Sequence, residues 1–398
     1  MNPAHALVGQ SRLPRVKTTI FSVMSQLAAE HGALNLSQGF PDFDCPERLR
    51  ELVGEAMRAG HNQYAPMPGV PLLRERIAEK VRSLYGARVD MDQEITVTCG
   101  ATEALFVAIQ TVVRPGDEVI VFDPAYDSYE PAVELAGGRT IHLPLRAPDY
   151  KIDWQQLSDA VGPKTRLIVI NTPHNPTGSA LEPDDLDHLA GIVANSKAYL
   201  IGDEVYEHIV FDGAEHQSLL RREELRQRSF VISSFGKTYH TTGWKIGYCI
   251  APPPMTAEFR KIHQYVTFSI STPMQYAIAH FMTDPGFHLG LPAFYQEKRD
   301  YFRTALEGSR FRLLPCSGTY FQLLDYRDIS DRPDLEMARW MVEHAGIAAI
   351  PVSVFYAESP EDHGRDDRIL RLCFAKSNET LDRAAERLRS LRGCRSAG

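Results

Sequence analysis

The 398-residue sequence lacks the features that would place a protein in a membrane or direct it out of the cell. It has no run of about 18 apolar residues, so no membrane-spanning helix and no membrane partner are expected. The N-terminus, Met1–His5, has no basic segment followed by an apolar core, which argues against a signal peptide. We therefore expect a cytoplasmic protein.

A block of basic residues is also absent, and the net charge is -8, which argues against a nucleic-acid partner. Arginines near the C-terminus are interleaved with apolar residues at helical spacing, which predicts a C-terminal helix with a solvated basic face. Its apolar positions are Leu381, Ala384, Ala385, Leu388 and Leu391.

The sequence contains no C-x-x-C pair among its six cysteines, and several of them lie in apolar runs. We expect buried, reduced thiols and no role in disulfides or in a metal site. The cysteines are Cys45, Cys99, Cys249, Cys316, Cys373 and Cys394.

Gly236-Lys237-Thr238 has the ending of a nucleotide-binding P-loop but lacks its first glycine. That glycine would stand five positions before Gly236, where the sequence has Val231 within an apolar run. The pattern therefore favours another role for Lys237.

Seven short apolar runs alternate with longer helical patterns in the middle of the chain. This alternation predicts an α/β fold with a mostly parallel seven-stranded sheet flanked by helices. The runs are 95–98, 118–122, 140–143, 166–170, 198–201, 230–233 and 246–250.

The length fits about two to three domains. The pattern changes near Pro285 to that of a smaller α+β unit, with strands expected within 318–323, 347–350 and 369–374. We expect a large domain at 46–284 and a small domain formed by 1–45 together with 285–398.

Ligands of parallel sheets bind beyond the carboxyl ends of the strands, so the residues that follow each run are candidates for a site. Gly100–Ala104 resembles a helix N-terminus that binds phosphate, although an ordinary turn explains it equally well. Tyr126 either stacks on a planar ligand or packs in the core. Asn171–Gly178 (N-T-P-H-N-P-T-G) is a long polar loop with amide donors, or a proline-fixed turn.

Three charged residues complete the set. Asp203 closes an apolar run, where it either caps a helix or pairs with a cation such as a protonated pyridine nitrogen. Lys237 is either a desolvated nucleophile or a surface lysine. Arg371 lies inside an apolar strand and binds either a ligand carboxylate or a structural acid. Together these residues point to pyridoxal 5′-phosphate (PLP).

The chain resembles the fold-type I PLP-dependent aminotransferases of class I/II over nearly its whole length. The resemblance is carried by Asn171–Gly178, by Gly202–Tyr206 (G-D-E-V-Y) and by Ser233–Lys245. Within this family, Ser234–Thr238 followed by Thr242–Lys245 is most similar to the bacterial methionine aminotransferases, which neighbour the kynurenine and glutamine-K enzymes.

The resemblance implies a role for each matching residue. Lys237 holds PLP covalently and, once freed, moves a proton between the substrate Cα and the cofactor. Asp203 pairs with the pyridine nitrogen, and Tyr206 bonds the phenolic oxygen together with Asn175. The remaining residues are the phosphate ligands Gly100, Ala101, Thr102, Ser234 and Lys245, the stacking Tyr126, and the carboxylate clamp Arg371 with Asn175.

The resemblance also implies contacts that close the site. Gly39 and Phe40 belong to an N-terminal segment that covers the substrate next to Tyr126. Tyr64 reaches the phosphate of a second subunit, so a homodimer is expected.

Two positions depart from the pattern of many relatives. Many relatives have arginine where Lys245 stands. Kynurenine enzymes favour a Phe-His pair where this sequence has Ile270-Ser271, which fits a flexible thioether substrate better.

The expected reaction is ping-pong transfer of an amino group from an L-amino acid, with methionine as donor and aromatic side chains tolerated, to a 2-oxo acid. A PLP-dependent C–S β-lyase would use the same lysine, aspartate and arginine. A non-catalytic PLP-binding regulator is the other alternative, but the segment before Cys45 is too short for an added DNA-binding domain.

Overall fold

The computed structural model describes residues 11–357 and 368–391. Its largest sheet has seven strands in the order β2-β8-β7-β6-β5-β3-β4. Each strand coincides with one of the seven apolar runs, so the prediction of these strands is confirmed. They are β2 (Ile95–Thr98), β3 (Glu118–Asp123), β4 (Arg139–Pro144), β5 (Thr165–Asn171), β6 (Tyr199–Asp203), β7 (Ser229–Ser234) and β8 (Gly247–Ile250).

The sheet is mostly parallel, as predicted. Only β8 runs antiparallel, and it pairs with β2 and β7, while the other neighbours are parallel. The carboxyl ends of β3, β5, β6 and β7 therefore meet at one edge of the sheet, where Asp123, Asn171, Asp203 and Ser234 end their strands.

Both faces of the sheet are covered because its strands are apolar at successive positions. Val119 and Val121 of β3 pack in one hydrophobic cluster, and Ile120 and Phe122 pack in the other. Since neighbouring side chains of a strand point to opposite faces, such a strand requires helices on both sides. On the side of Val119 lie α5 (Gly100–Val112), α6 (Tyr129–Leu135) and α11 (Pro253–Val266).

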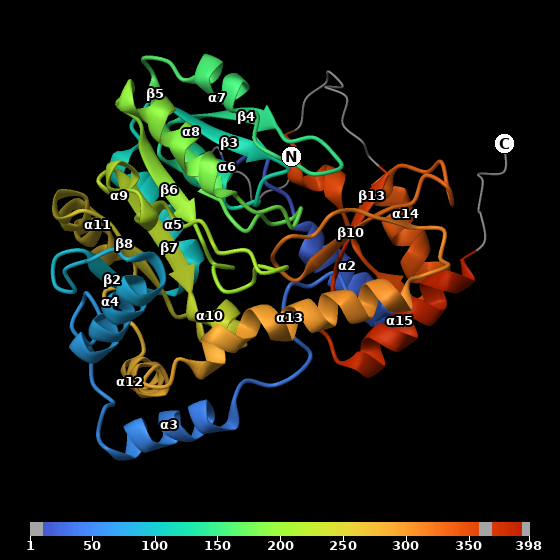
Figure 1. Cartoon of the computed structure of the whole chain (residues 1–398), viewed down its shortest axis with the longest axis horizontal. Coiled ribbons are helices and arrows are strands. Elements are labelled where there is room, and N and C mark those ends of the chain that lie inside the picture. The colour runs from blue at the N-terminus through green and yellow to red at the C-terminus, as the bar shows by residue number, and fades with distance from the viewer. Residues whose placement is uncertain (1–10, 358–367, 392–398) are drawn as a thin grey trace, which may run out of the picture.

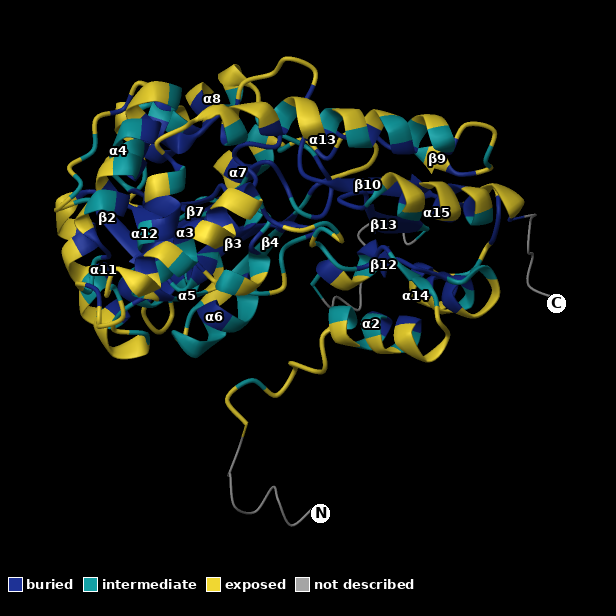
Figure 2. Ribbon diagram, turned by 90° about the horizontal axis from the view of Figure 1, so that it is seen from below, coloured by how far each residue is buried: buried dark blue, intermediate teal, exposed yellow. Residues whose placement is uncertain are grey.

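The opposite face packs against helices that contribute to the larger cluster. These are α3 (Glu47–Arg58), α4 (Pro71–Tyr85), α7 (Trp154–Ala160), α8 (Pro183–Ala194), α9 (Glu223–Arg226) and α12 (Thr272–Phe281). The short α10 (Phe235–Thr238) follows β7 directly. Figure 2 shows buried strands beneath helices whose outer surfaces are exposed.

A second region contains two small sheets. The antiparallel sheet has the order β12-β13-β10-β9, and β1 pairs with β11 in parallel. The strands are β1 (Leu34–Asn35), β9 (Arg312–Leu313), β10 (Phe321–Asp325), β11 (Ile347–Ala348), β12 (Ile350–Pro351) and β13 (Ile369–Cys373). Helices α2 (Ile20–Glu30), α14 (Asp334–Trp340) and α15 (Asn378–Ser390) pack beside them.

The long helix α13 (Gly286–Ala305) reaches from the seven-stranded sheet's side of the molecule to α15 (Figure 1). The pairing of β1 with β11 brings the N-terminal segment to the C-terminal strands. We propose from this arrangement that residues 46–284 form a large domain and that 1–45 with 285–398 form a small one.

The C-terminal helix predicted from its apolar spacing is confirmed as α15, which buries Leu381, Ala384, Ala385 and Leu388. Cys45, Cys249, Cys316 and Cys373 are buried free thiols and Cys99 is a half-buried one, whereas Cys394 lies outside the described residues. Across residues 11–357 and 368–391, no helix combines the length and the apolar character needed to cross a bilayer.

Candidate active site

A cavity of about 260 Å³ lies at the carboxyl edge of the seven-stranded sheet, where the sequence predicted a site. Most of the predicted site residues line it. Its walls are Gly39, Phe40, Ala101, Thr102, Leu105, Tyr126, Asn171, Asn175, Asp203, Val205, Tyr206, Ser234, Gly236, Lys237, Thr242 and Lys245.

Asp203 ends β6 at the floor of this cavity. Its Oδ2 accepts a hydrogen bond of 2.6 Å from the Tyr129 hydroxyl. Its Oδ1 is buried and has no hydrogen-bond partner in the described part of the chain. Burial raises the pKa of Asp203 to about 6. Since a buried carboxylate oxygen requires a donor, Oδ1 is suited to accept a hydrogen bond from a ligand N–H.

Lys237 lies in α10, only three residues after the end of β7. Its Nζ donates hydrogen bonds to the Tyr320 hydroxyl at 2.9 Å and to the Gly39 carbonyl at 3.1 Å. Burial lowers its pKa to about 8, and the charge of Arg371 acts in the same direction. An amine with this pKa is partly unprotonated near neutral pH and is able to act as a nucleophile. Because α10 has only four residues, the segment is not a P-loop.

The N-terminus of α5 forms another wall of the cavity. Gly100 begins the helix with φ of +70°, and a Cβ there would lie 3.2 Å from Nζ of Lys245. The backbone N–H groups of the first helical turn have no partner within the helix. With Lys245 and Ser234 beside them, these groups at Ala101 and Thr102 are suited to bind an anion.

Arg371 is fully buried in β13 but does not itself line the cavity. Its guanidinium donates to Oδ1 of Asn175 at 2.7 Å and to the Ser37 carbonyl at 3.1 Å, and it lies 3.9 Å from the ring centre of Phe321. Its Nε has no hydrogen-bond partner among the described residues. Burial lowers its pKa to about 10. The contact with Asn175 places this cation at the edge of the cavity, within reach of a small carboxylate.

Tyr64 is the predicted site residue that lies apart from the cavity. Its side chain is 83% exposed and contacts the ring of Phe268 edge-on at 5.3 Å.

Three residues hold the site together, and the sequence singled out only Asn171 among them. Tyr129 donates to Asp203. Asn171 donates from Nδ2 to the Asp203 carbonyl at 2.8 Å and accepts from the Asn175 N–H at the same distance. Tyr320 contacts Lys237 from a segment 83 residues away. Asn171 begins the polar loop that was predicted to carry amide donors, whereas Tyr129 and Tyr320 are recognisable only in the folded chain.

A buried polar cluster lies beneath the segment that follows Asp203. Glu207 accepts hydrogen bonds from Lys80 at 2.6 Å and Tyr248 at 2.8 Å, and also from Tyr85 and Ser233. The partners come from α4, β7 and β8. Because one buried carboxylate connects these elements, the chain around Asp203 and Tyr206 is held rigidly.

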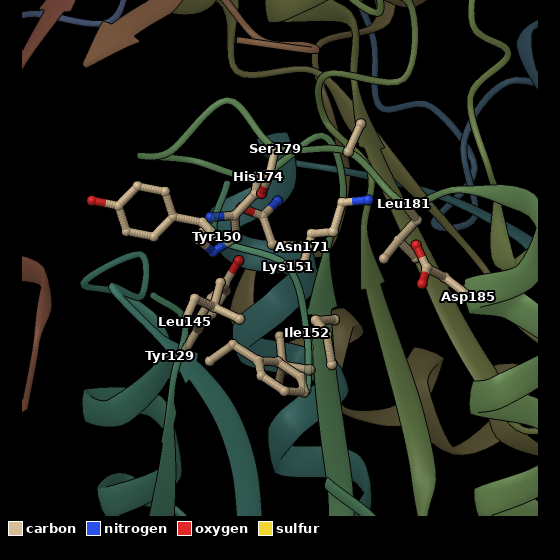
Figure 3. A pocket seen from close by; sticks show the side chains of 13 residues that line it. Tyr129, Leu145, Tyr150, Lys151, Ile152, Asn171, His174, Ser179, Leu181 and Asp185 are labelled. Atoms are coloured by element: carbon tan, nitrogen blue, oxygen red, sulfur yellow. The ribbon is translucent and has the colours of Figure 1, made fainter. Parts of the chain in front are cut away.

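A much smaller cavity, of about 30 Å³, lies on the other side of Tyr129 and Asn171. Figure 3 shows Tyr150, Lys151 and His174 around it. It has room for a water molecule but not for a cofactor. Lys237 and Asp203 do not line it, so the chemistry belongs to the larger cavity.

The model of the aminotransferase class I and II family matches residues 32–388. The chain belongs to this family. It is therefore an aminotransferase, and its substrates are amino acids and 2-oxo acids.

Curated relatives support the same assignment. The chain is 51% identical to the methionine aminotransferase of Escherichia coli K12, over 97% of this chain and 99% of the relative. It is 38% identical to a probable N-succinyldiaminopimelate aminotransferase of Mycobacterium tuberculosis, over 95% and 97% of the two chains. Identity to mouse kynurenine–oxoglutarate transaminase 1 is 33%, over 93% and 94%.

Solved structures agree with the fold. The crystal structure of YbdL from Escherichia coli, described as having a methionine aminotransferase function, superposes with a TM-score of 0.93 at 50% identity and covers 96% of this chain and 100% of its own. The Mycobacterium tuberculosis N-succinyldiaminopimelate aminotransferase gives a TM-score of 0.91 at 37% identity, with coverage of 96% and 100%. The predicted PLP-transferase fold is confirmed.

Membership of this family implies PLP as the cofactor, and the residues of the cavity fit it. The unpartnered Oδ1 of Asp203 provides the acceptor that a pyridinium N–H requires. The N-terminus of α5 and Lys245 provide positive potential for a phosphate. The Lys237 amine lies in the same cavity as both.

Proposed function

We propose that this aminotransferase transfers the amino group of methionine to a 2-oxo acid by a ping-pong mechanism. Aromatic L-amino acids are tolerated as alternative donors. PLP is the carrier and is bound covalently by Lys237. The observation that carries the proposal is the presence, in one cavity, of an amine with a lowered pKa and a buried carboxylate oxygen without a partner.

Bound PLP supplies an electron sink for the negative charge that develops at the substrate Cα. Asp203 stabilises positive charge on the ring nitrogen, because its Oδ1 has no other donor among the described residues. Tyr129 keeps Oδ2 hydrogen-bonded, which fixes the orientation of the carboxylate. Burial raises the pKa of Asp203 to about 6 even though the charge of Lys237 lowers it, and a positive ring nitrogen would favour the ionised carboxylate further.

Lys237 moves the proton at Cα. Its pKa of about 8 makes the free amine an effective base near neutral pH. Tyr206 and Asn175 both line the cavity and would bond the phenolic oxygen of the cofactor. Burial raises the pKa of Tyr206, so its hydroxyl remains a donor at neutral pH.

Two further sets of residues would hold the cofactor. Its phosphate would be bound at Gly100, Ala101 and Thr102, with Ser234 and Lys245 as side-chain ligands. Tyr126, which lines the same cavity, would stack on the ring. Contacts to both the phosphate and the ring would fix the orientation of the cofactor relative to Lys237, and fixed orientation is a large part of catalysis.

The substrate carboxylate binds Arg371, with Asn175 as the second contact. The unpartnered Nε of Arg371 leaves donor capacity for this ligand. Gly39 and Phe40 border the side-chain end of the cavity. Methionine as the donor is supported by the 51% identity to an enzyme named for that substrate.

A homodimer completes the site, with Tyr64 of each subunit bonding the phosphate in the other. An exposed aromatic pair supports this arrangement, because exposed apolar groups gather at protein interfaces. Tyr64 and Phe268 are both exposed, and their rings contact each other at 5.3 Å. The buried free thiols Cys249, Cys316 and Cys373 support a reducing, cytoplasmic location.

The function is tested by following amino transfer from methionine, phenylalanine, kynurenine and aspartate to a set of 2-oxo acids. We expect methionine to give the highest kcat/KM and phenylalanine to react measurably. Aspartate as the best donor would contradict the proposed substrate. Release of pyruvate and ammonia from cystathionine without any 2-oxo acid, at a rate above amino transfer, would identify a β-lyase instead.

A further inference from the structure

Tyr320 connects Lys237 to the N-terminal segment. Its hydroxyl lies 2.9 Å from Nζ of Lys237 and 2.5 Å from the carbonyl oxygen of Gly39, and Nζ is also 3.1 Å from that carbonyl. The three groups come from α10, from the loop after β1, and from the residue before β10.

The donors and acceptors of this triangle follow from chemistry. The Gly39 carbonyl only accepts, so the single hydrogen of the Tyr320 hydroxyl is donated to it. The hydroxyl oxygen is then the acceptor for Lys237. Burial raises the pKa of Tyr320 well above its ordinary value, so the phenol keeps its proton.

A neutral lysine amine has two N–H bonds and one lone pair. The Tyr320 oxygen and the Gly39 oxygen take up both N–H bonds of Lys237. We propose that Tyr320 is a positioning residue, which with the Gly39 carbonyl holds the freed amine of Lys237 so that its lone pair remains available for the proton at the substrate Cα. This inference rests on the proposed role of Lys237 as the proton carrier.

The position of Tyr320 is fixed independently of Lys237. Its ring is buried and contacts the rings of Tyr206 at 5.1 Å, Phe321 at 5.0 Å and Tyr295 at 5.7 Å. A Cβ on Gly39 would lie 2.8 Å from Phe321, so the chain approaches this aromatic group as closely as glycine allows. Because packing already fixes the Tyr320 hydroxyl, no entropy is lost in ordering it when Lys237 is released from the cofactor.

Other charged or titratable groups also influence the pKa of Lys237. They are Asp203 of β6, Arg371 and Cys373 of β13, and Lys245 after the turn that follows α10. Removal of the Tyr320 hydroxyl changes none of these residues. Because a hydroxyl acceptor favours the protonated amine, its loss lowers the pKa of Lys237 further.

The test compares Tyr320→Phe with Tyr295→Phe in the full-length enzyme. Both changes remove one buried hydroxyl and keep the ring, but the hydroxyl of Tyr295 has no hydrogen-bond partner in the described part of the chain. Each variant is measured in a single turnover with methionine and with methionine deuterated at Cα. The pKa of Lys237 is measured separately, from the pH dependence of its acetylation by acetic anhydride in the cofactor-free chain.

For Tyr320→Phe we expect the single-turnover rate to fall about tenfold, the effect of one lost hydrogen bond, with half-saturating methionine unchanged. The deuterium isotope effect rises, and the acetylation midpoint moves down by about one pH unit. Tyr295→Phe leaves all four quantities at their wild-type values.

A Tyr320→Phe variant that matches Tyr295→Phe overturns the proposal. So does a variant whose loss appears only as weaker methionine binding, since that reports altered packing. Neither result affects the role of Lys237, which is tested by Lys237→Ala. If Lys237→Ala still transfers amino groups, the proposed role of Lys237 fails, and with it the inference about Tyr320.

Discussion

Asp203 has two carboxylate oxygens in different environments, and this difference sets its function. Tyr129 occupies Oδ2, while Oδ1 is buried without a partner among the described residues. A structural helix cap, the other interpretation of the sequence, would have its acceptors satisfied by backbone N–H groups. The unsatisfied oxygen therefore favours a ligand-binding role.

Replacing this carboxylate tests its role. Asp203→Asn cannot stabilise positive charge on a ring nitrogen, so we expect amino transfer to slow by about 100-fold or more while the fold is kept. The rate is measured in a single turnover with methionine. Asp123→Asn is the matched control, because Asp123 also ends a buried strand but does not line the cavity. Equal rates in the two variants would contradict the assignment.

Lys237 gives a prediction about stability. Burial lowers its pKa to about 8 in the folded chain, against an ordinary value of 10.5. Between these pH values the unfolded chain binds a proton that the folded chain does not, so the free energy of unfolding rises with pH. We expect Lys237→Met to remove this rise, as measured by urea unfolding of the cofactor-free chain from pH 8 to 10.5. The same slope in both proteins would show that the amine is not desolvated.

At the scale of elements, the strand ends explain why much of the site was predictable. Apolar runs identified all seven strands of the large sheet, and the last residues of every strand except the antiparallel β8 lie at one edge. Asp203 and Lys237 were found because each comes at or just after the end of such a run. No local pattern places Tyr320 beside Lys237, because its segment is joined to the site by tertiary packing alone. Tyr64 was found only through the family resemblance.

The N-terminus of α5 gives a prediction with a close control. Gly100→Ala places an alanine at a φ of +70°, and its Cβ would lie 3.2 Å from the Lys245 side chain. Gly116→Ala places an alanine at a φ of +87°, but its Cβ would meet no atom within 4 Å. Both variants lose about 1 kcal/mol of stability through the backbone. Only Gly100→Ala also weakens PLP binding, because it displaces the phosphate ligand Lys245. Equal PLP affinity in the two variants, measured by equilibrium titration, would remove this loop from the phosphate site.

At the scale of the molecule, Tyr64 is exposed and does not line the cavity of its own chain. If Tyr64 serves the partner's site, a mixed dimer of a chain that lacks Lys237 and a chain that lacks Tyr64 has one intact site. That site takes Lys237 from one chain and Tyr64 from the other. We expect Lys237→Ala and Tyr64→Ala chains, unfolded and refolded together, to regain activity in the mixed dimer. Activity no higher than the average of the separate variants would show that Tyr64 does not act across the interface.

The central claim is that Lys237 binds PLP and that methionine is the amino donor. The most direct measurement is the visible absorption of the purified full-length protein with PLP, before methionine, after methionine, and after a 2-oxo acid. We predict a yellow band that methionine bleaches and the 2-oxo acid restores, and that is absent in Lys237→Ala. A band that persists in Lys237→Ala, or that methionine leaves unchanged in the wild-type protein, would contradict the account.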